Sequence, residues 1–382
     1  MALMPPLDIP PLGISEREAR TRFAALQRKL VPLWEHICRF NETEQTIVVV
    51  PSQTIEFDCK GAEMQAYEER MLFMLLLLRQ PRARLIYATS QTILPSTLDY
   101  YFSILPGVVS SHAAQRFFNI AVEDRSPRPL TVKLLERPHV YQRIRSLILD
   151  PDRAHLVANN VTRYERDLAL RLGVPIYGAD PELAPLGTKS GGREVFASAG
   201  VAYPTGSEHL RSLADLLNAL GEMREKKPGL TRAIVKLNDA VSGEGNAVVE
   251  LAELPAPGSA DASALLEQRV RSMTFELSSM TSERFFASLA HLGGVAEECI
   301  RGTGFCSPSV QMRISPLGEL EVLSTHDQIL GGPMGQSFLG SRFPADHGYG
   351  PLITVEGRKG GAAAGGTRRS GPVRDRFRCR AG

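Results

Sequence analysis

The stretch RAIVKLNDAVSGEGNAVVEL, residues 232–251, contains two apolar runs joined by a short polar loop, a pattern typical of two paired strands. Lys236 lies on the first run, and the loop Ser242–Asn246 contains Gly243 and Gly245. Because glycines leave backbone N–H groups unshielded, this loop can close over a polyphosphate while the lysine neutralises part of its charge. A hairpin turn rich in Gly, Ser and Asn needs no ligand, however, and the stretch alone fits both interpretations.

Two common nucleotide-binding motifs are missing from the sequence. It contains no GxxxxGK[ST], and no GxGxxG lies between an expected strand and an expected helix. P-loop and dinucleotide-binding folds therefore lose their main support.

Length and composition are those of a globular protein with two or three domains. The chain has 382 residues, of which 43% are hydrophobic and 23% charged. Its formal net charge is +2, but residues 360–382 hold six Arg and one Asp, a net of +5, which leaves −3 for the rest. Because this excess lies in a Gly/Ala/Arg-rich tail, we expect no nucleic-acid partner and no membrane partner.

Cysteine usage indicates a reducing compartment. The five cysteines are widely spaced and form no CxxC, which argues against a disulfide framework and a structural zinc site. Residues 1–13 lack the basic region and apolar run of a secretory signal. The longest apolar run, Met71–Leu78, is too short to span a bilayer. We therefore predict a soluble, cytoplasmic protein.

The first half of the chain predicts an α/β domain. A leading helix is expected from Ser15 to about Arg39, with Ser15 as its N-cap and a kink at Pro32. Three β-branched runs that end in small polar residues are expected strands, and a helix over 61–79 makes the first two a βαβ unit. These runs are 46–52, 84–90 and 154–160. We expect an N-terminal helical segment over 1–40 and the α/β domain over 41–180.

The second half predicts an α+β domain with mostly antiparallel strands, over residues 181–359. After a proline-containing linker at 180–187, one helix is expected to end at Gly200 and another to run from about Ser207 to Met223. The paired strands of 232–251 follow, then two helices near 262–291 and a hairpin over 310–324.

Several long strings extend this pattern to a known family. They include GVPIYGADPELAPLGTKSGGREVFASAGV (173–201), VKLNDAVSGEGNAVVEL (235–251), GGVAEECIRG (293–302) and SPSVQMRISPLGELEVLSTHDQILGGPMGQSFLG (307–340). Over residues 45–355 the sequence resembles the ATP-grasp superfamily, and most closely the carboxylate–amine ligases of the pheganomycin-type peptide ligase group. The resemblance implies a pre-ATP-grasp α/β domain followed by an ATP-grasp domain with a lid subdomain and a truncated catalytic subdomain.

The resemblance also implies a set of ATP contacts. Lys189 and Lys236 match the two ATP-contacting lysines, although a solvated surface lysine is the alternative for each. In the strand that follows, the backbone of Glu297 would accept from the adenine amino group and the N–H near Ile300 would donate to the ring. Gly304 stands where an acid often binds the ribose. The full set is Lys189, Lys236, Ser242, Gly243, Glu244, Gly245, Asn246, Glu297, Glu298 and Ile300.

The implied chemistry is activation of a carboxylate by ATP to an acylphosphate, which an amine then attacks to give an amide, ADP and phosphate. Such catalysis depends on positioning and charge neutralisation, so no side-chain nucleophile is expected. Arg313 is a candidate further phosphate contact, with an exposed strand arginine as the alternative. His326 and Asp327 are neighbours on an expected strand, so their side chains point to opposite faces and we do not expect a metal site there.

The family's magnesium ligands have no counterpart in this sequence. Members continue into an acidic strand with an E-x-N-type motif, whereas here residues 360–382 show neither strand nor helix periodicity and contain one acid, Asp375. We expect a disordered tail and no Mg²⁺ ligands. Either the protein is a shortened relative that binds ATP without turnover, or the tail is an out-of-frame reading of a gene that restores the metal site. The sequence therefore fits two functions, a carboxylate–amine ligase and a non-catalytic ATP-binding or scaffold module.

Overall fold

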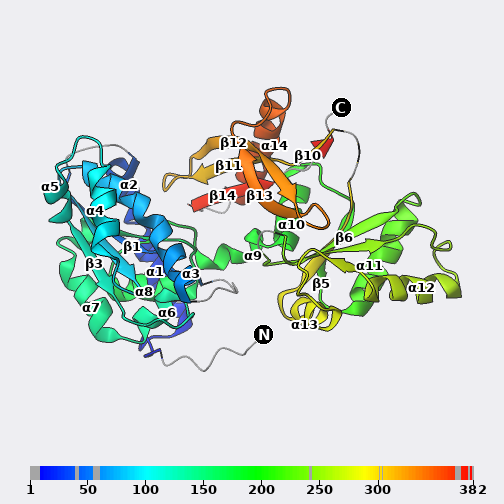
Figure 1. Cartoon of the computed structure of the whole chain (residues 1–382), viewed down its shortest axis with the longest axis horizontal. Coiled ribbons are helices and arrows are strands. Elements are labelled where there is room, and N and C mark those ends of the chain that lie inside the picture. Colours follow the sequence, from blue (N-terminus) through cyan, green and yellow to red (C-terminus); the bar gives the residue numbers. More distant parts are fainter. Residues whose placement is uncertain are drawn as a thin grey trace. The chain divides into compact units, whose positions relative to one another are not determined.

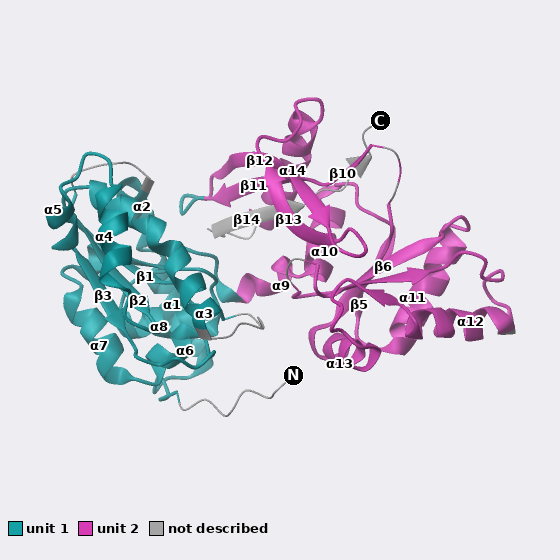
Figure 2. Cartoon of the chain, in the orientation of Figure 1, with its two compact units in different colours: residues 1–181, 315–317 teal, residues 182–314, 318–382 magenta. Residues whose placement is uncertain are grey.

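The computed structural model describes residues 9–38, 43–54, 61–240, 243–300, 302, 304–365, 371–376 and 379–380. The chain forms two compact units, Met1–Pro181 with Ser315–Leu317 and Glu182–Ile314 with Gly318–Gly382 (Figure 2). The first is α/β with a parallel sheet and the second contains antiparallel sheets, so the predicted fold class is confirmed. Among the described helices none is long and apolar enough to cross a membrane.

Unit 1 is built on a four-stranded parallel sheet in the order β3-β2-β1-β4 (Figure 1). The strands are β1 (Gln45–Val50), β2 (Ala83–Thr89), β3 (Phe117–Ala121) and β4 (Ala154–Ala158). In β1, Val48 and Val50 belong to one apolar cluster, whereas Ile47 and Val49 belong to another. A sheet buried on both faces explains the unbroken apolar run, and it confirms the predicted βαβ unit. The sequence prediction missed β3, a half-buried edge strand.

Helices cover both faces of this sheet. One cluster joins it to α1 (Glu16–Gln27), α6 (Leu130–Leu135), α7 (Pro138–Leu147) and α8 (Arg163–Leu172). The other joins it to η1 (Arg70–Arg79), α4 (Pro95–Ser103) and α5 (Ser110–Ala114). The remaining helices are α2 (Leu30–Cys38), α3 (Gly61–Glu69) and η2 (Pro151–Arg153). Ser15 caps α1 by accepting from the backbone N–H of Glu18, as predicted, and the leading helix breaks shortly before Pro32.

Unit 2 contains a five-stranded antiparallel sheet in the order β5-β9-β6-β7-β8. Its strands are β5 (Gly206–Leu210), β6 (Arg232–Leu237), β7 (Asn246–Glu250), β8 (Thr274–Phe275) and β9 (Gly294–Glu298). One face packs on α11 (Leu213–Lys226), α12 (Ala260–Arg271) and α13 (Ser282–Leu292). The helix predicted from about Ser207 to Met223 is present as α11, but its predicted start was wrong: residues 206–210 pair with β9, and Ser212 caps α11 by accepting from the Asp215 N–H.

A second sheet of unit 2 has the order β13-β12-β11-β14. Its strands are β11 (Pro308–Ile314), β12 (Leu320–Gly331), β13 (Ser337–Arg342) and β14 (Gly371–Arg376). The predicted hairpin is confirmed by the antiparallel β11–β12 pair. A small cluster that includes Phe196, Met312 and Ile353 joins this sheet to α10 (Lys189–Ala199) and α14 (Gly350–Gly365). The remaining elements are η3 (Pro181–Leu183), α9 (Ala184–Gly187), β10 (Phe305–Cys306) and β15 (Cys379–Arg380).

Helix α14 enters the segment for which we expected no regular structure. Gly357, Gly361 and Gly365 recur every four residues and bring the helix backbone close to the sheet. A Cβ added at Gly361 would lie 2.9 Å from the Leu320 side chain, and one at Gly357 would lie 3.3 Å from Met312 Cε. Packing against the sheet explains a helix whose composition has low intrinsic helix propensity.

Candidate functional site

The face of the five-stranded sheet that does not pack on α11–α13 carries three of the predicted contact residues, Lys236, Asn246 and Glu297. Cross-strand register places Lys236 opposite Asn246 on β7 and opposite Val295 on β9, and places Ile234 opposite Val248 and Glu297. Directly opposed residues of antiparallel strands project from the same face. Ile234, Val248 and Val295 thus form an apolar floor, with Lys236 and Asn246 at the end near the glycine loop.

Lys236 is held by a buried carboxylate. Its ammonium pairs with Glu297 Oε2, and Arg193 Nη1 lies 3.0 Å from Glu297 Oε1. Burial raises the pKa of Glu297, but the two neighbouring cations outweigh burial and bring that pKa down to about 2. Glu297 therefore stays ionised and fixes both cations on the sheet face. Arg193 also stacks on the Tyr203 ring, with 4.7 Å between the guanidinium carbon and the ring centre.

Glu297 differs from its expected role in one respect. It lies opposite Ile234 on one side and Gly206 on the other, so neighbouring strands flank its backbone on both sides. Its side chain, rather than its backbone, is the group presented to the site. The residues after β9 include the half-buried Ile300, which was also expected in the site.

Glu298 is engaged at the edge of the same sheet. Its Oε1 accepts from the Thr205 N–H at 3.0 Å, and its Oε2 pairs with Lys227. Burial raises the pKa of Glu298, but the contacts with Lys227 and the Thr205 N–H lower that pKa by more than burial raises it. The pKa of Glu298 therefore lies below its usual value. The side chain of Glu298 thus ties β5 to β9, which is a structural role. Gly304 has a φ of +77° and is exposed, so it presents no side chain to a ribose.

Lys189 lies at the base of the glycine loop. It is the first residue of α10, and its ammonium donates to the carbonyl oxygens of Asn238 at 3.2 Å and Ala240 at 3.0 Å. The adjacent Ser190 donates from its N–H and its hydroxyl to Asn238 Oδ1, at 3.1 and 2.9 Å. The structure thus brings Lys189 and Lys236, which lie far apart in sequence, to the two sides of the β6–β7 connection.

The glycine loop is tightly built where the structure describes it. A Cβ added at Gly245 would lie 2.2 Å from the Ala240 Cβ, and Gly243 has a φ of +92°. Glu244 is exposed, whereas Asn246 is buried. Ser242, also expected in the site, lies outside the described residues. Local packing is thus sufficient to explain why these two positions are glycine.

Arg313 does not stand free as a phosphate contact. It lies opposite Glu321 across the β11–β12 pair, and its guanidinium forms an ion pair with that carboxylate. Val310 and Met312 join the core cluster and Ile314 is buried, so the intervening Arg313 projects from the opposite face of the sheet. A partly neutralised strand arginine is the interpretation that this geometry favours.

His326 and Asp327 point to opposite faces, as predicted. Asp327 accepts from the Tyr349 hydroxyl at 2.7 Å and from the Asp346 N–H at 3.0 Å. The His326 ring lies 5.0 Å from the Phe343 ring. Within the described residues, no group of three or more His, Cys, Asp or Glu side chains could hold a metal ion.

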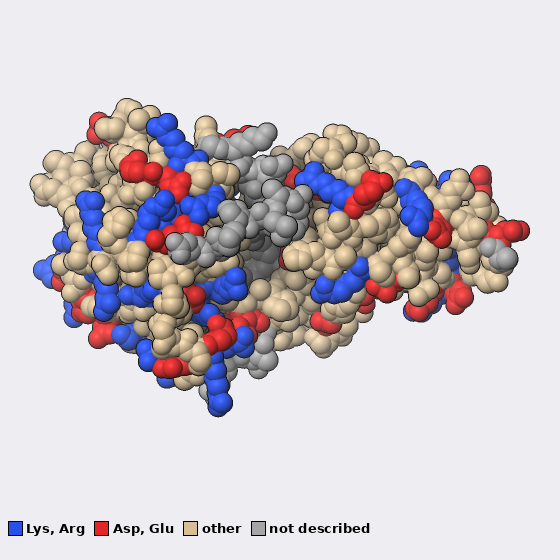
Figure 3. Space-filling model, turned by 90° about the horizontal axis from the view of Figure 1, so that it is seen from below, with Lys and Arg blue, Asp and Glu red and all other residues tan. Residues whose placement is uncertain are grey.

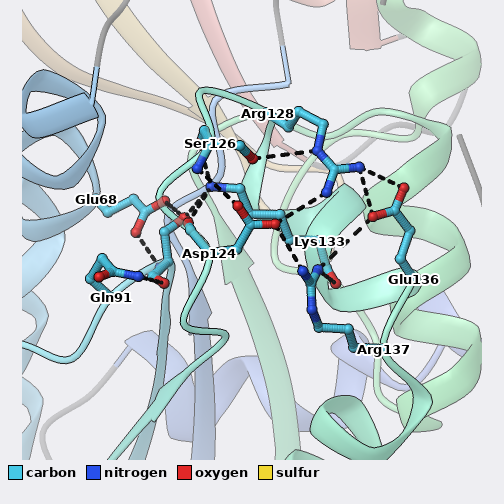
Figure 4. A network of polar contacts seen from close by, with 9 residues as sticks. Glu68, Gln91, Asp124, Ser126, Arg128, Lys133, Glu136 and Arg137 are labelled. Carbon is cyan, nitrogen blue, oxygen red and sulfur yellow. Dashed lines mark hydrogen bonds and ion pairs between the residues drawn. The ribbon is translucent and has the colours of Figure 1, made fainter. Parts of the chain in front are cut away.

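A second polar cluster lies in unit 1 and was not predicted from the sequence (Figure 4). Lys133 is fully buried and donates to Ser90 Oγ at 2.8 Å and to the carbonyls of Asp124 and Ser126 at 3.0 and 2.7 Å. Glu68 accepts from the N–H and the hydroxyl of Ser90, both at 2.6 Å. Burial lowers the pKa of Lys133 and raises that of Glu68. These contacts join the loops that follow β2 and β3, which indicates a structural role.

Comparison with known proteins agrees with this geometry. Residues 181–271 match the family model described as IQCH-like, ATP-grasp. The L-propargylglycine–L-glutamate ligase of Streptantibioticus cattleyicolor is 32% identical over 308 residues, which cover 78% of this chain and 60% of that protein. IQ motif-containing protein H of Danio rerio is 25% identical over 368 residues, which cover 84% of this chain and 34% of that protein. The chain thus spans between about a third and three fifths of these relatives' lengths.

Among solved structures, biotin carboxylase from Campylobacter jejuni, determined as a β,γ-ATP complex, has a TM-score of 0.55 to this chain. The two are 15% identical, and the similarity covers 88% of this chain and 62% of that one. At this identity the likeness shows the fold alone. The match over residues 181–271, the relative from Streptantibioticus and the shared fold together make the chain similar to proteins of the ATP-grasp superfamily.

Proposed function

We propose that unit 2 binds ATP on the face of its five-stranded sheet that does not pack on α11–α13, and that the protein is an ATP-dependent carboxylate–amine ligase. The observation that carries the proposal is the row formed by Lys236 and Asn246, which lie opposite each other at the two ends of the glycine loop. Ile234, Val248 and Val295 lie on the same face and are buried, and they would form the apolar side of the adenine site. Polyphosphate and base would thus lie at opposite ends of one sheet face.

The proposed roles follow from charge and position. Lys189 and Lys236 are point charges at the two sides of the β6–β7 connection, where they would neutralise phosphate oxygens. Backbone N–H groups of residues 243–245 would add donors. Glu297 and Arg193 would keep Lys236 in place, and the segment 298–300 would contact the adenine edge.

The proposed reaction has two steps. A carboxylate oxygen attacks the γ-phosphorus of ATP, the bond to the bridging oxygen breaks, and ADP leaves with an acylphosphate formed. An amine then attacks the acyl carbon, the C–O bond to phosphate breaks, and an amide and inorganic phosphate result. In this scheme the residues of the chain position the reactants and neutralise phosphate charge.

The substrate class is proposed from the relative that joins L-propargylglycine to L-glutamate. By analogy, the acid and the amine would be small molecules such as amino acids. Lys and Arg are interspersed with Asp and Glu on the face drawn in Figure 3, which supports small-molecule partners rather than a polyanion. Cys299 and Cys306 are not in a disulfide, in keeping with a proposed cytoplasmic location.

A second candidate function is ATP binding without turnover. It is favoured by the lack of any metal-ligand group within the described residues. Phosphoryl transfer normally needs a cation to screen the β- and γ-phosphates. A scaffold or sensor that binds ATP would not need one.

Titration calorimetry with ATP and an ADP-release assay with pairs of amino acids separate these functions. Binding together with amine-dependent ADP release supports the ligase. Binding without release supports the non-catalytic module, and the lack of ATP binding would refute both.

A further inference from the structure

Glu276 is a buried acid that none of the roles above uses. It follows β8 and is 4% exposed. Its Oε1 accepts from the Ser337 hydroxyl at 2.6 Å, and its Oε2 accepts from the Met334 N–H at 3.1 Å. Met334 lies in the connection between β12 and β13, and Ser337 is the first residue of β13, so one side chain fastens the 332–337 loop to the five-stranded sheet.

The same residue is tied to the glycine loop. The Glu276 N–H donates to the carbonyl of Asn246 at 3.0 Å, which extends the β7–β8 ladder by one residue. Glu276 thus continues the row of Lys236 and Asn246 across the sheet. Asn246 is 5% exposed, and its Oδ1 has no hydrogen-bond partner within the described part of the chain.

The two connections also touch directly. A Cβ added at Gly243 would lie 2.5 Å from the carbonyl oxygen of Gln336, so only glycine allows the two backbones this close. On the other side, a Cβ added at Gly332 would lie 1.9 Å from Glu276 Oε1. Glycine at each contact lets the carboxylate and the two loops pack as one body.

We propose that Glu276 is a positioning residue that fastens the 332–337 loop to the 243–246 loop, so that the two loops form a single wall of the polyphosphate site. The proposal rests on the proposed ATP site of unit 2. The carboxylate does not itself face phosphate, because like charges would repel and both of its oxygens accept from the 332–337 loop. Glu276 therefore affects nucleotide binding only by holding the two loops in position.

Hydrogen exchange without nucleotide, followed by ATP titration, tests the proposal on three variants. Glu276→Ala removes both acceptors, and Ser337→Ala removes one bond and serves as the milder variant. Glu276→Gln retains an oxygen for the Met334 N–H and gains an amide that can donate to the Ser337 hydroxyl. Glu267→Ala, which removes an exposed ion pair with Arg271 on α12, is the matched control.

For Glu276→Ala we expect exchange to rise at least roughly tenfold in both loops, and ATP affinity to fall by roughly tenfold. Glu276→Gln should show the wild-type exchange in both loops and the wild-type ATP affinity. Glu267→Ala should change neither the exchange nor the affinity. Unchanged exchange, or a rise confined to residues 332–337, would overturn the fastening of the two loops. If wild type binds ATP and Glu276→Ala binds it equally well, the nucleotide role is overturned. If wild type does not bind ATP, the proposed site fails, and the exchange data alone still decide whether Glu276 joins the loops.

Discussion

Replacing Glu297 by glutamine should destabilise unit 2 and remove a specific part of its pH dependence. The carboxylate is nearly buried and pairs with both Lys236 and Arg193. The amide of glutamine keeps the size of the side chain but leaves the two cations without their shared counter-ion. Losing one partner of a buried ion pair is costly because a charge stays behind in a poorly solvated site.

The pKa of Glu297 sets the magnitude. A fall from its ordinary value of 4.5 to about 2 corresponds to about 3 kcal/mol of stabilisation by the ionised form. Because the pKa is lower in the folded state, this stabilisation is complete above pH 4.5 and is lost as the pH falls from 4.5 towards 2. Linkage gives a loss of about 1 kcal/mol by pH 4 and about 2 kcal/mol by pH 3.

Urea unfolding of wild type and Glu297→Gln at pH 7, 4 and 3 is the assay. The single tryptophan, Trp34, lies in unit 1, so peptide-resolved hydrogen exchange of residues 206–298 is needed to follow unit 2. At pH 7 the variant should be less stable by about 3 kcal/mol, and at pH 3 by about 1 kcal/mol. Equal stability at pH 7, or a difference that does not shrink on acidification, would refute the reasoning.

Three further changes test other parts of the structure. Lys236→Ala should weaken ATP binding by roughly 10- to 100-fold in calorimetry, because it removes a charged donor, and unchanged affinity would place that lysine outside the site. Gly245→Ala puts a Cβ 2.2 Å from that of Ala240, so the melting temperature should drop by several degrees; an unchanged value would show that the loop relaxes at no cost. Lys133→Met leaves the buried Glu68 cluster without its cation and should cost about 3–5 kcal/mol in urea unfolding followed by tryptophan fluorescence, whereas a near-neutral effect would contradict its structural role.

Sequence patterns predicted strands in which every residue is buried. The run TIVVV is apolar at every position because both faces of its sheet are covered, and it was identified as a strand. The strands β3 and β5 escaped prediction because both lie at sheet edges and are only half buried. Helix α14 escaped because packing against β11 and β12, rather than propensity, explains its formation.

Site residues that lie close together in sequence could be predicted. Those that are brought together only by the fold could not. Lys236 and the glycine loop are adjacent in sequence, and their placement on one strand connection followed from that. The side-chain role of Glu297 arises from Arg193, about a hundred residues earlier, and from cross-strand register. Glu276 follows a two-residue strand and contacts a loop about sixty residues later, so no pattern around it indicated a role.

The central claim is that ATP binds on the face of the five-stranded sheet of unit 2 that does not pack on α11–α13. Photolabelling with 8-azido-ATP, followed by peptide mapping, tests it directly, because the azide reports the position of the adenine ring. The account predicts labelled peptides within residues 233–250 or 294–300, with labelling abolished by excess ATP. ATP-sensitive labelling confined to residues 9–180 would contradict it.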